Sequence, residues 1–217
     1  MTAPAESLKS GPAAVPGYLA DTYWWAYVHP GAVRVFGLDP VADPVRVLSR
    51  IGYLSEEHDV PGWMRVDELL RYSRAFYPDW DDAYAAELLR DFALDPAARI
   101  RSLSKGQKAR AGLLVALAHR PDLLVLDEPS SGLDPIVRRD ILAAVLRTIA
   151  DEGRTVLFSS HLLDEVEQVA DHVTMISRGR IVLSAPLESL REAHGGQSLD
   201  EIFVARVGAS ATVPAGS

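Results

Sequence analysis

The stretch Leu123-Leu124-Val125-Leu126-Asp127-Glu128-Pro129 decides the fold of this 217-residue chain. Its unbroken apolar run predicts a strand buried on both faces of a parallel sheet, and the proline ends it. Open sheets of this kind bind ligands beyond the carboxyl ends of their strands, where Asp127 and Glu128 fall. One carboxylate there can hold Mg²⁺ and the other can orient an attacking water, although Asp-Glu-Pro is also an ordinary way to end a strand.

Strands and helices alternate around this stretch, which predicts an α/β fold with a parallel sheet covered on both faces. Upstream we expect strands at 31–37 and 47–54 and helices at 64–77, 81–93 and 104–120. Downstream we expect strands at 122–127, 155–160, 172–177 and 180–184, and helices at 135–151, 162–170 and 198–206. Residues 1–17 resemble a flexible arm, and periodicity leaves the aromatic run 18–28 undecided between strand and helix.

Composition narrows the class of protein. The net charge of −8 and the absence of a basic block argue against a nucleic-acid partner. The chain has no cysteine, which excludes disulfides and thiolate metal sites and fits a reducing compartment. No apolar run approaches the ~20 residues that span a bilayer, and no signal peptide is recognisable.

Three further motifs carry candidate chemistry. Ser104, Gly106 and Gln107 open a helix, where backbone N–H groups can face a phosphate, although for these residues taken alone a plain N-cap is the better explanation. His161 ends a strand and could contact a γ-phosphate, although a lone histidine there is more often structural. Asp134 stands before Pro135 as the N-cap of a helix, which needs no further function.

In this order, the motifs resemble those of the nucleotide-binding subunit of ABC transporters, over about residues 30–208. Leu103–Gln107 is similar to the family's signature loop, and residues 123–129 are similar to its Mg²⁺-and-water strand. Ser131–Asp134 is similar to the loop that touches the opposite subunit, and His161 to the switch histidine. Residues 51–56 match the stretch that ends in the family's glutamine, but this chain has Glu56 there.

The resemblance implies a P-loop NTPase-like (RecA-like) core in residues 31–208, with a helical subdomain at about 60–121. It implies ATP and Mg²⁺ as cofactors, with Asp127 and Glu56 toward the metal and Glu128 and His161 as catalytic residues. Ser104, Gly106, Gln107 and Asp134 would contact nucleotide. The implied partners are a membrane permease and a second ATP-binding subunit, identical or different, so the chain would be cytoplasmic and peripheral on the inner face of the membrane.

The family's phosphate loop is missing from this sequence. No G-x-x-x-x-G-K-[ST] occurs, and the only lysines are Lys9, Lys105 and Lys108. Residues 1–30 therefore form an atypical or disordered arm, and either the loop has been lost or the reading frame is shifted between Gly11-Pro12 and residues 27–31. We expect an impaired site in this chain. We also expect the strand at 122–127 to lack a neighbour, because the phosphate-loop strand would normally lie beside it.

Two alternatives to an ATP-hydrolysing subunit stay open: a non-hydrolysing helper that lends its signature loop to an intact partner, and a non-enzymatic scaffold on a permease. Residues 76–81, the lysine of the signature loop and residues 199–203 resemble bacterial ATPases of drug and antibiotic exporters. In that subtype Trp63, Met64 and Tyr72 could be exposed to receive the permease, or could pack into the subdomain itself. Residues 209–217 are expected to be a disordered tail.

Overall fold

The computed structural model describes residues 33–57, 60–150 and 153–211. The chain divides into two compact units, residues 1–125 and 126–217, which are described separately below. The expectations for residues 1–30, including the aromatic run 18–28, and for residues 212–217 lie outside the described part of the chain.

The described part of the first unit begins with a tight turn, and residues 33–37 do not form the strand expected at 31–37. Val35 and Leu38 exchange backbone hydrogen bonds of 2.9 Å around Phe36 and Gly37, whose φ angles are both positive. Two consecutive positive φ angles are typical of the tightest hairpin turns. The strand expected at 47–54 is also shorter than predicted, since β1 spans Ile51–Leu54 and Val47 belongs to the short helix α2 (Pro44–Leu48).

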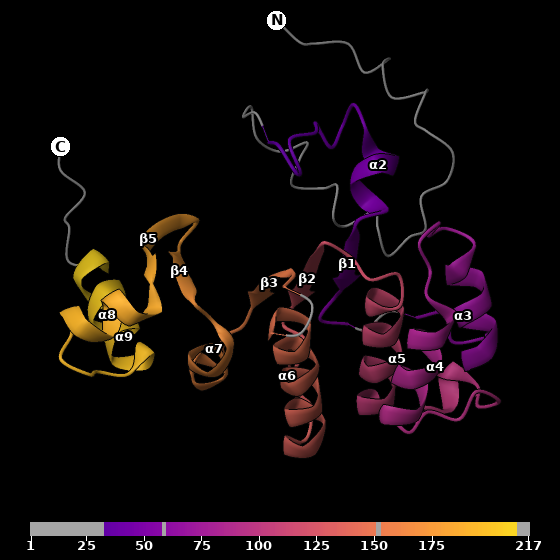
Figure 1. Cartoon of the computed structure of the whole chain (residues 1–217). Coiled ribbons are helices and arrows are strands. Elements are labelled where there is room, and N and C mark those ends of the chain that lie inside the picture. Colours follow the sequence, from indigo (N-terminus) through magenta and orange to yellow (C-terminus); the bar gives the residue numbers. More distant parts are fainter. Residues whose placement is uncertain (1–32, 58–59, 151–152, 212–217) are drawn as a thin grey trace, which may run out of the picture. The chain divides into compact units, whose positions relative to one another are not determined.

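Three helices and a 3₁₀ turn complete the first unit: α3 (Val66–Arg74), α4 (Asp82–Asp91), η1 (Ile100–Ser102) and α5 (Lys105–Leu117). Helix α4 begins where the Asp81 carboxylate accepts a hydrogen bond from the Tyr84 amide at 2.9 Å. Helix α5 packs against α3, α4 and β1 and is buried along most of its length (Figure 1). The expected helices at 64–77, 81–93 and 104–120 are therefore confirmed, with shorter ends.

Strand β2 (Leu123–Asp127) is the middle of a three-stranded sheet in the order β1-β2-β3, where β3 is Thr155–Ser159. Consecutive strands are joined through helices, as a parallel sheet requires. Our expectation that β2 would lack a neighbour is wrong, because it pairs on both sides and Leu124 and Leu126 are buried. Within the described residues, β3 is instead the end strand of this sheet.

The second unit continues with helix α6 and strand β3 and ends in a compact C-terminal module. Its remaining elements are α6 (Pro135–Ala150), α7 (Leu163–Val169), β4 (His172–Ser177), β5 (Arg180–Pro186), α8 (Leu187–Ala193) and α9 (Leu199–Ala211). β4 and β5 form an antiparallel hairpin, which turns at Arg178 and Gly179 with positive φ angles. Sequence reasoning placed these elements correctly but missed α8 and ended α9 too early.

The C-terminal module has its own apolar core. The buried residues come from β4 and the helices α8 and α9, and β5 adds only partly buried side chains: Val173, Met175, Leu187, Leu190, Leu199 and Ile202 are buried. Residues from α7, including Val166, pack against this core as well. Helix α7 therefore links the strand-end region that precedes it to the C-terminal module.

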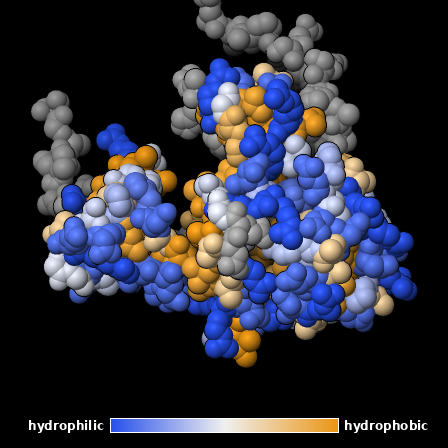
Figure 2. Space-filling model, in the orientation of Figure 1, coloured by the Kyte–Doolittle hydropathy of each residue, from blue (hydrophilic) through white to orange (hydrophobic). Residues whose placement is uncertain are grey.

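Exposed apolar side chains are found in both units. Of the two alternatives left open for these residues in the first unit, exposure holds for Trp63 and Tyr72, whereas Met64 is buried in the core. In the second unit Leu157 on β3 is 61% exposed, and Figure 2 shows hydrophobic surface over the region of this strand. No helix in the described part of the chain is both long and apolar enough to cross a bilayer.

Candidate functional site

The ends of β2 and β3 bring the predicted metal ligand next to a serine. Asp127 is the last residue of β2, and its carboxylate accepts a hydrogen bond of 2.6 Å from the Ser159 hydroxyl at the end of β3. Asp127 is exposed, so the carboxylate faces solvent beyond the sheet edge. The position agrees with the ligand-binding edge of parallel sheets.

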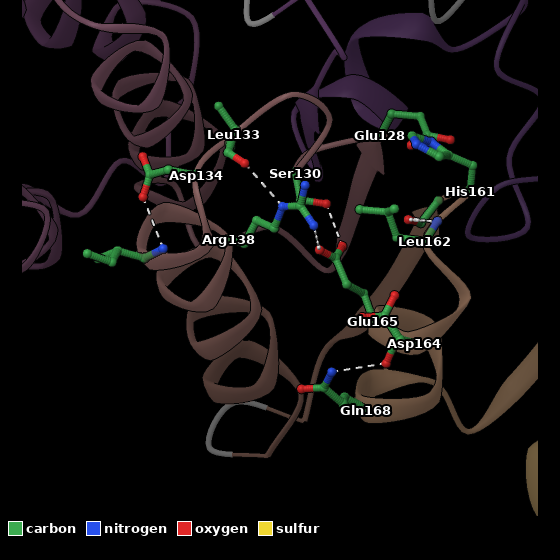
Figure 3. A network of polar contacts seen from close by, with 12 residues as sticks. Glu128, Ser130, Leu133, Asp134, Arg138, His161, Leu162, Asp164, Glu165 and Gln168 are labelled. Atoms are coloured by element: carbon green, nitrogen blue, oxygen red, sulfur yellow. Dashed lines mark hydrogen bonds and ion pairs between the residues drawn. The ribbon is translucent and has the colours of Figure 1, made fainter. Parts of the chain in front are cut away.

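The two predicted catalytic residues contact each other. His161 Nδ1 lies 2.6 Å from Glu128 Oε2, and the histidine side chain is 63% exposed whereas that of Glu128 is 21% exposed (Figure 3). The structure therefore brings together a half-buried carboxylate and an accessible imidazole, as a site that orients a water molecule beside a phosphate requires.

The backbone of Glu128 is strained. Its φ angle is +46°, in the left-handed region that costs a residue other than glycine of order 1–3 kcal/mol. Its amide donates to the Ser159 carbonyl at 3.2 Å and lies 3.0 Å from the Ser159 hydroxyl oxygen. The end of β3 thus holds Glu128 in a conformation that sharply turns the chain after Asp127.

The loop after Glu128 is a series of short turns that ends at Asp134. The Ser131 amide donates to the Glu128 carbonyl at 3.0 Å, and Gly132 takes a positive φ. The Asp134 carboxylate accepts from the amides of Ile136 and Val137 at 3.0 and 3.2 Å, so its predicted N-cap role is confirmed. Its contact with nucleotide stays a prediction.

In the first unit, the predicted signature loop forms a complete helix cap. The Ser104 hydroxyl accepts from the Gln107 amide at 3.2 Å, and the Gln107 side chain accepts from the Ser104 amide at 3.0 Å. This reciprocal pair is a capping box. Gly106 is buried between these two residues, in the first turn of α5. The expected cap is confirmed, and the contact of these residues with nucleotide stays a prediction.

Glu56 lies in an exposed turn directly after β1. The structure places it in the first unit, whereas Asp127 belongs to the second. Its predicted role toward the metal therefore stays a prediction.

The donor set fits Mg²⁺ only in a particular way. Among the described residues, no group of three or more acidic, histidine or cysteine side chains could hold a metal ion alone. Mg²⁺ usually takes one or two carboxylates and completes its shell with water and substrate phosphates. The exposed Asp127 carboxylate suits that arrangement, and when bound the ion would neutralise phosphate charge.

Sequence reasoning missed several polar residues of this region. It assigned no role to Ser159, which contacts both Asp127 and Glu128. It also assigned none to the buried Ser130 and Glu165 and the partly exposed Arg138 behind the loop. The signal for Ser159 was available, since it ends a strand beside the Asp-Glu strand. Glu165 gave no such signal, because a glutamate in the first turn of a helix is normally exposed.

Comparison with known proteins defines the class. A family model described as "AAA domain, putative AbiEii toxin, Type IV TA system" matches residues 72–166. A solved structure titled "Structure of ATP binding subunit of ABC transporter" matches with a TM-score of 0.76 and 25% identity, covering 89% of this chain and 85% of the other. A dimeric ATP-binding cassette bound to ADP and Pi shares the fold, with a TM-score of 0.61 and 17% identity over 70% of this chain and 72% of the other.

Two curated relatives give the family. The chain is 32% identical over 183 residues to the ABC transporter ATP-binding protein NatA of Bacillus subtilis (strain 168), covering 82% of this chain and 74% of NatA. It is 33% identical over 174 residues to the daunorubicin/doxorubicin resistance ATP-binding protein DrrA of Streptomyces peucetius, covering 78% of this chain and 52% of DrrA. The chain thus spans about half the length of DrrA. It belongs to the family of ABC transporter ATP-binding proteins.

Proposed function

We propose that this chain is the ATP-binding subunit that powers a separate membrane permease of the drug- or antibiotic-export kind, with impaired hydrolysis in its own site. The observation that carries the proposal is the contact between Glu128 and His161 beside Asp127. The carboxylates and the imidazole needed for water activation are assembled, while the 217 residues contain no phosphate loop to position ATP against them.

The proposed class of transported compound is inferred from the name of one relative. DrrA is named for resistance to daunorubicin and doxorubicin, which supports a small organic compound as cargo. The permease would contact the helical subdomain at about residues 60–121, within the ABC domain at residues 31–208. The exposed Trp63 and Tyr72 are suited to that contact, since large exposed aromatic side chains are enriched at protein interfaces. Such a subunit would sit in the cytoplasm against the membrane, held by the permease.

A second candidate is favoured by the signature loop. The capping box of Ser104 and Gln107, with Gly106 buried between them in the first turn of α5, presents these residues from a rigid helix end. A helper subunit needs only this half, because in the head-to-tail dimer of the family it completes the nucleotide site of a partner. This chain would then support hydrolysis in a partner subunit that carries the phosphate loop.

The test uses the complex isolated with its native permease and compares hydrolysis of Mg-ATP by two variants. Glu128→Gln should lower turnover only if the site of this chain works, and Glu188→Gln, an exposed glutamate of α8, is its control. Ser104→Arg should lower turnover in a partner's site. Ser198→Arg is its matched control, because Ser198 pairs with Glu201 at the start of α9 as Ser104 pairs with Gln107.

The outcomes separate the candidates. A small loss with Glu128→Gln and a large loss with Ser104→Arg supports an impaired subunit. A loss with Ser104→Arg alone supports the helper. If neither variant changes hydrolysis or transport, the chain is a permease-docking scaffold and the proposal of an ATP site is wrong.

A further inference from the structure

A polar cluster lies behind the loop that follows Glu128. It consists of two buried residues, Ser130 from the loop and Glu165 from α7, and the partly exposed Arg138 from α6 (Figure 3). Ser130 is 0% exposed and Glu165 is 3% exposed. Burying a carboxylate costs free energy unless opposite charge and hydrogen bonds compensate for it, so the buried Glu165 requires stabilising contacts.

Each carboxylate oxygen of Glu165 faces a different segment. The Ser130 hydroxyl donates to Oε2 in a short hydrogen bond. Arg138 Nη1 lies 3.8 Å from Oε1, which is an ion-pair distance longer than a hydrogen bond. The same arginine donates from Nε to the Leu133 carbonyl at 3.2 Å. Glu165 therefore holds the beginning of the loop directly through Ser130, whereas its Oε1 makes no hydrogen bond to the described residues and lies only within ion-pair distance of Arg138.

These contacts close a ring with the candidate catalytic pair. Glu128 stands two residues before Ser130, and His161 stands four residues before Glu165 on the approach to α7. The intervening chain is tight on both sides, with Ser131 N–H bonded to the Glu128 carbonyl and Glu165 N–H to the Leu162 carbonyl, each at 3.0 Å. The contact of Ser130 with Glu165 is thus one side of a small ring, and the contact of Glu128 with His161 is the other.

We propose that Glu165 is a positioning residue. It connects the loop that follows Glu128 to helix α7, which begins just after His161, and thereby holds the strained Glu128 opposite His161. The inference rests on the proposed function only in taking Glu128 and His161 as the reacting pair. The strained φ of Glu128 needs such support, because a conformation of this kind persists only where its surroundings over-determine it.

The same helix offers a matched control. Glu167 lies two residues after Glu165, and its Oε1 accepts the Leu199 amide at 2.5 Å, at the start of α9. Glu167 thus ties α7 to the C-terminal module, whereas Glu165 ties it to the loop after Glu128. A Glu→Gln change at either position alters one carboxylate of the same helix. Glu165 is buried and Glu167 is partly exposed, and each change affects the segment that its carboxylate holds.

The test is residue-resolved amide hydrogen exchange by NMR on the full chain, with no nucleotide present. Ser130→Ala and Glu165→Gln should each speed exchange at the amides of Glu128 and Ser131 at least about tenfold and leave Leu199 unchanged. Glu167→Gln should speed exchange at the Leu199 amide and leave the amides of Glu128 and Ser131 unchanged. The ring C–H signal of His161 should shift in the first two variants and stay in place in the third.

Two results would overturn the inference. One is unchanged exchange at Glu128 and Ser131 in both Ser130→Ala and Glu165→Gln. The other is a uniform increase across the unit, including the β4–β5 hairpin, which would mean that Glu165 only stabilises the fold. Because the readout needs no ATP, failure of the ATPase experiments above would leave this test valid, and failure here would leave the proposed function standing.

Discussion

Helix α5 and strand β3 carry the two halves of the predicted nucleotide site, and they are held in different ways. Nine residues of α5 are buried, beginning with Gly106, two residues after the signature serine Ser104. None of the five residues of β3, all of them described, is buried. The helix that would serve a partner is held by an apolar core, whereas the strand that would serve this chain is held by its sheet pairing and by polar contacts at its end.

This difference indicates which of the two groups of predicted site residues keeps its position when no nucleotide is bound. Close packing fixes α5 whether or not nucleotide is bound, because a well-packed core has few alternative arrangements. The pairs of Ser159 with Asp127 and of His161 with Glu128 involve exposed side chains, which water can also satisfy. The predictions below test this contrast, beginning with the largest effect.

The largest effect is expected from Gly52→Ala in β1. A Cβ atom there would lie 2.1 Å from the Ala116 carbonyl oxygen of α5, which belongs to the backbone and cannot rotate away. We expect a loss of ~3–4 kcal/mol in the free energy of unfolding, measured by urea denaturation. Gly112→Ala is the control, since its Cβ would meet only the end of the Leu54 side chain, at 2.7 Å, and no backbone atom. Equal urea midpoints in wild type and Gly52→Ala would contradict the close approach of β1 to α5.

Paired truncations compare the two regions directly. Leu114 in α5 is 0% exposed and Leu157 in β3 is 61% exposed. Leu114→Ala should cost ~2–5 kcal/mol in unfolding free energy, because it leaves a cavity. Leu157→Ala should change it by no more than ~0.5 kcal/mol. A large loss from Leu157→Ala, measured in the same denaturation assay, would show that β3 is covered in solution.

Local signals predicted much of this fold. Ser104 with Gln107 three residues later marked the start of α5, and apolar alternation gave β4 with the bounds His172–Ser177 that the structure shows. The errors came where the deciding fact is not local. Val47 favours a strand by propensity but follows Pro44 in a helical turn, and the position of β2 between β1 and β3 depends on strand order.

The candidate site was predicted to a similar extent. The motifs gave Asp127, Glu128 and His161, and the structure brings these three together with Ser159. Glu165 could not be predicted, because its partner Ser130 is 35 residues away in the chain and a glutamate reads as a surface residue. The sequence motifs therefore do not reveal the residues that support the site, such as Glu165 and Ser130.

A smaller effect is expected from Ser104→Ala at the start of α5. The change removes the oxygen that accepts from the Gln107 amide and should cost about 1 kcal/mol of unfolding free energy. Ser104→Gly should cost only ~0.3 kcal/mol of unfolding free energy, since glycine is a tolerated N-cap. If both variants melt at the same temperature as the wild type, packing alone fixes the signature helix.

The smallest effect that we expect is a loss of folding stability at acidic pH. The side chain of Arg120 and then the Tyr84 amide hold the pKa of Asp81 below its ordinary value. A lowered pKa in the folded state means that the stabilisation is present above the unfolded pKa of about 4 and is lost as the pH falls below it. Urea midpoints measured from about pH 6 to pH 3 should show this loss in wild type and lack it in Asp81→Asn. The same slope in both proteins would contradict the pairing with Arg120.

The left-handed backbone of Glu128 sets two requirements of this position against each other. Glycine adopts that conformation freely, so Glu128→Gly would relieve local strain and remove the carboxylate. A glutamate at position 128 therefore keeps an acid at the turn at the expense of a relaxed backbone, a combination that is common at functional sites.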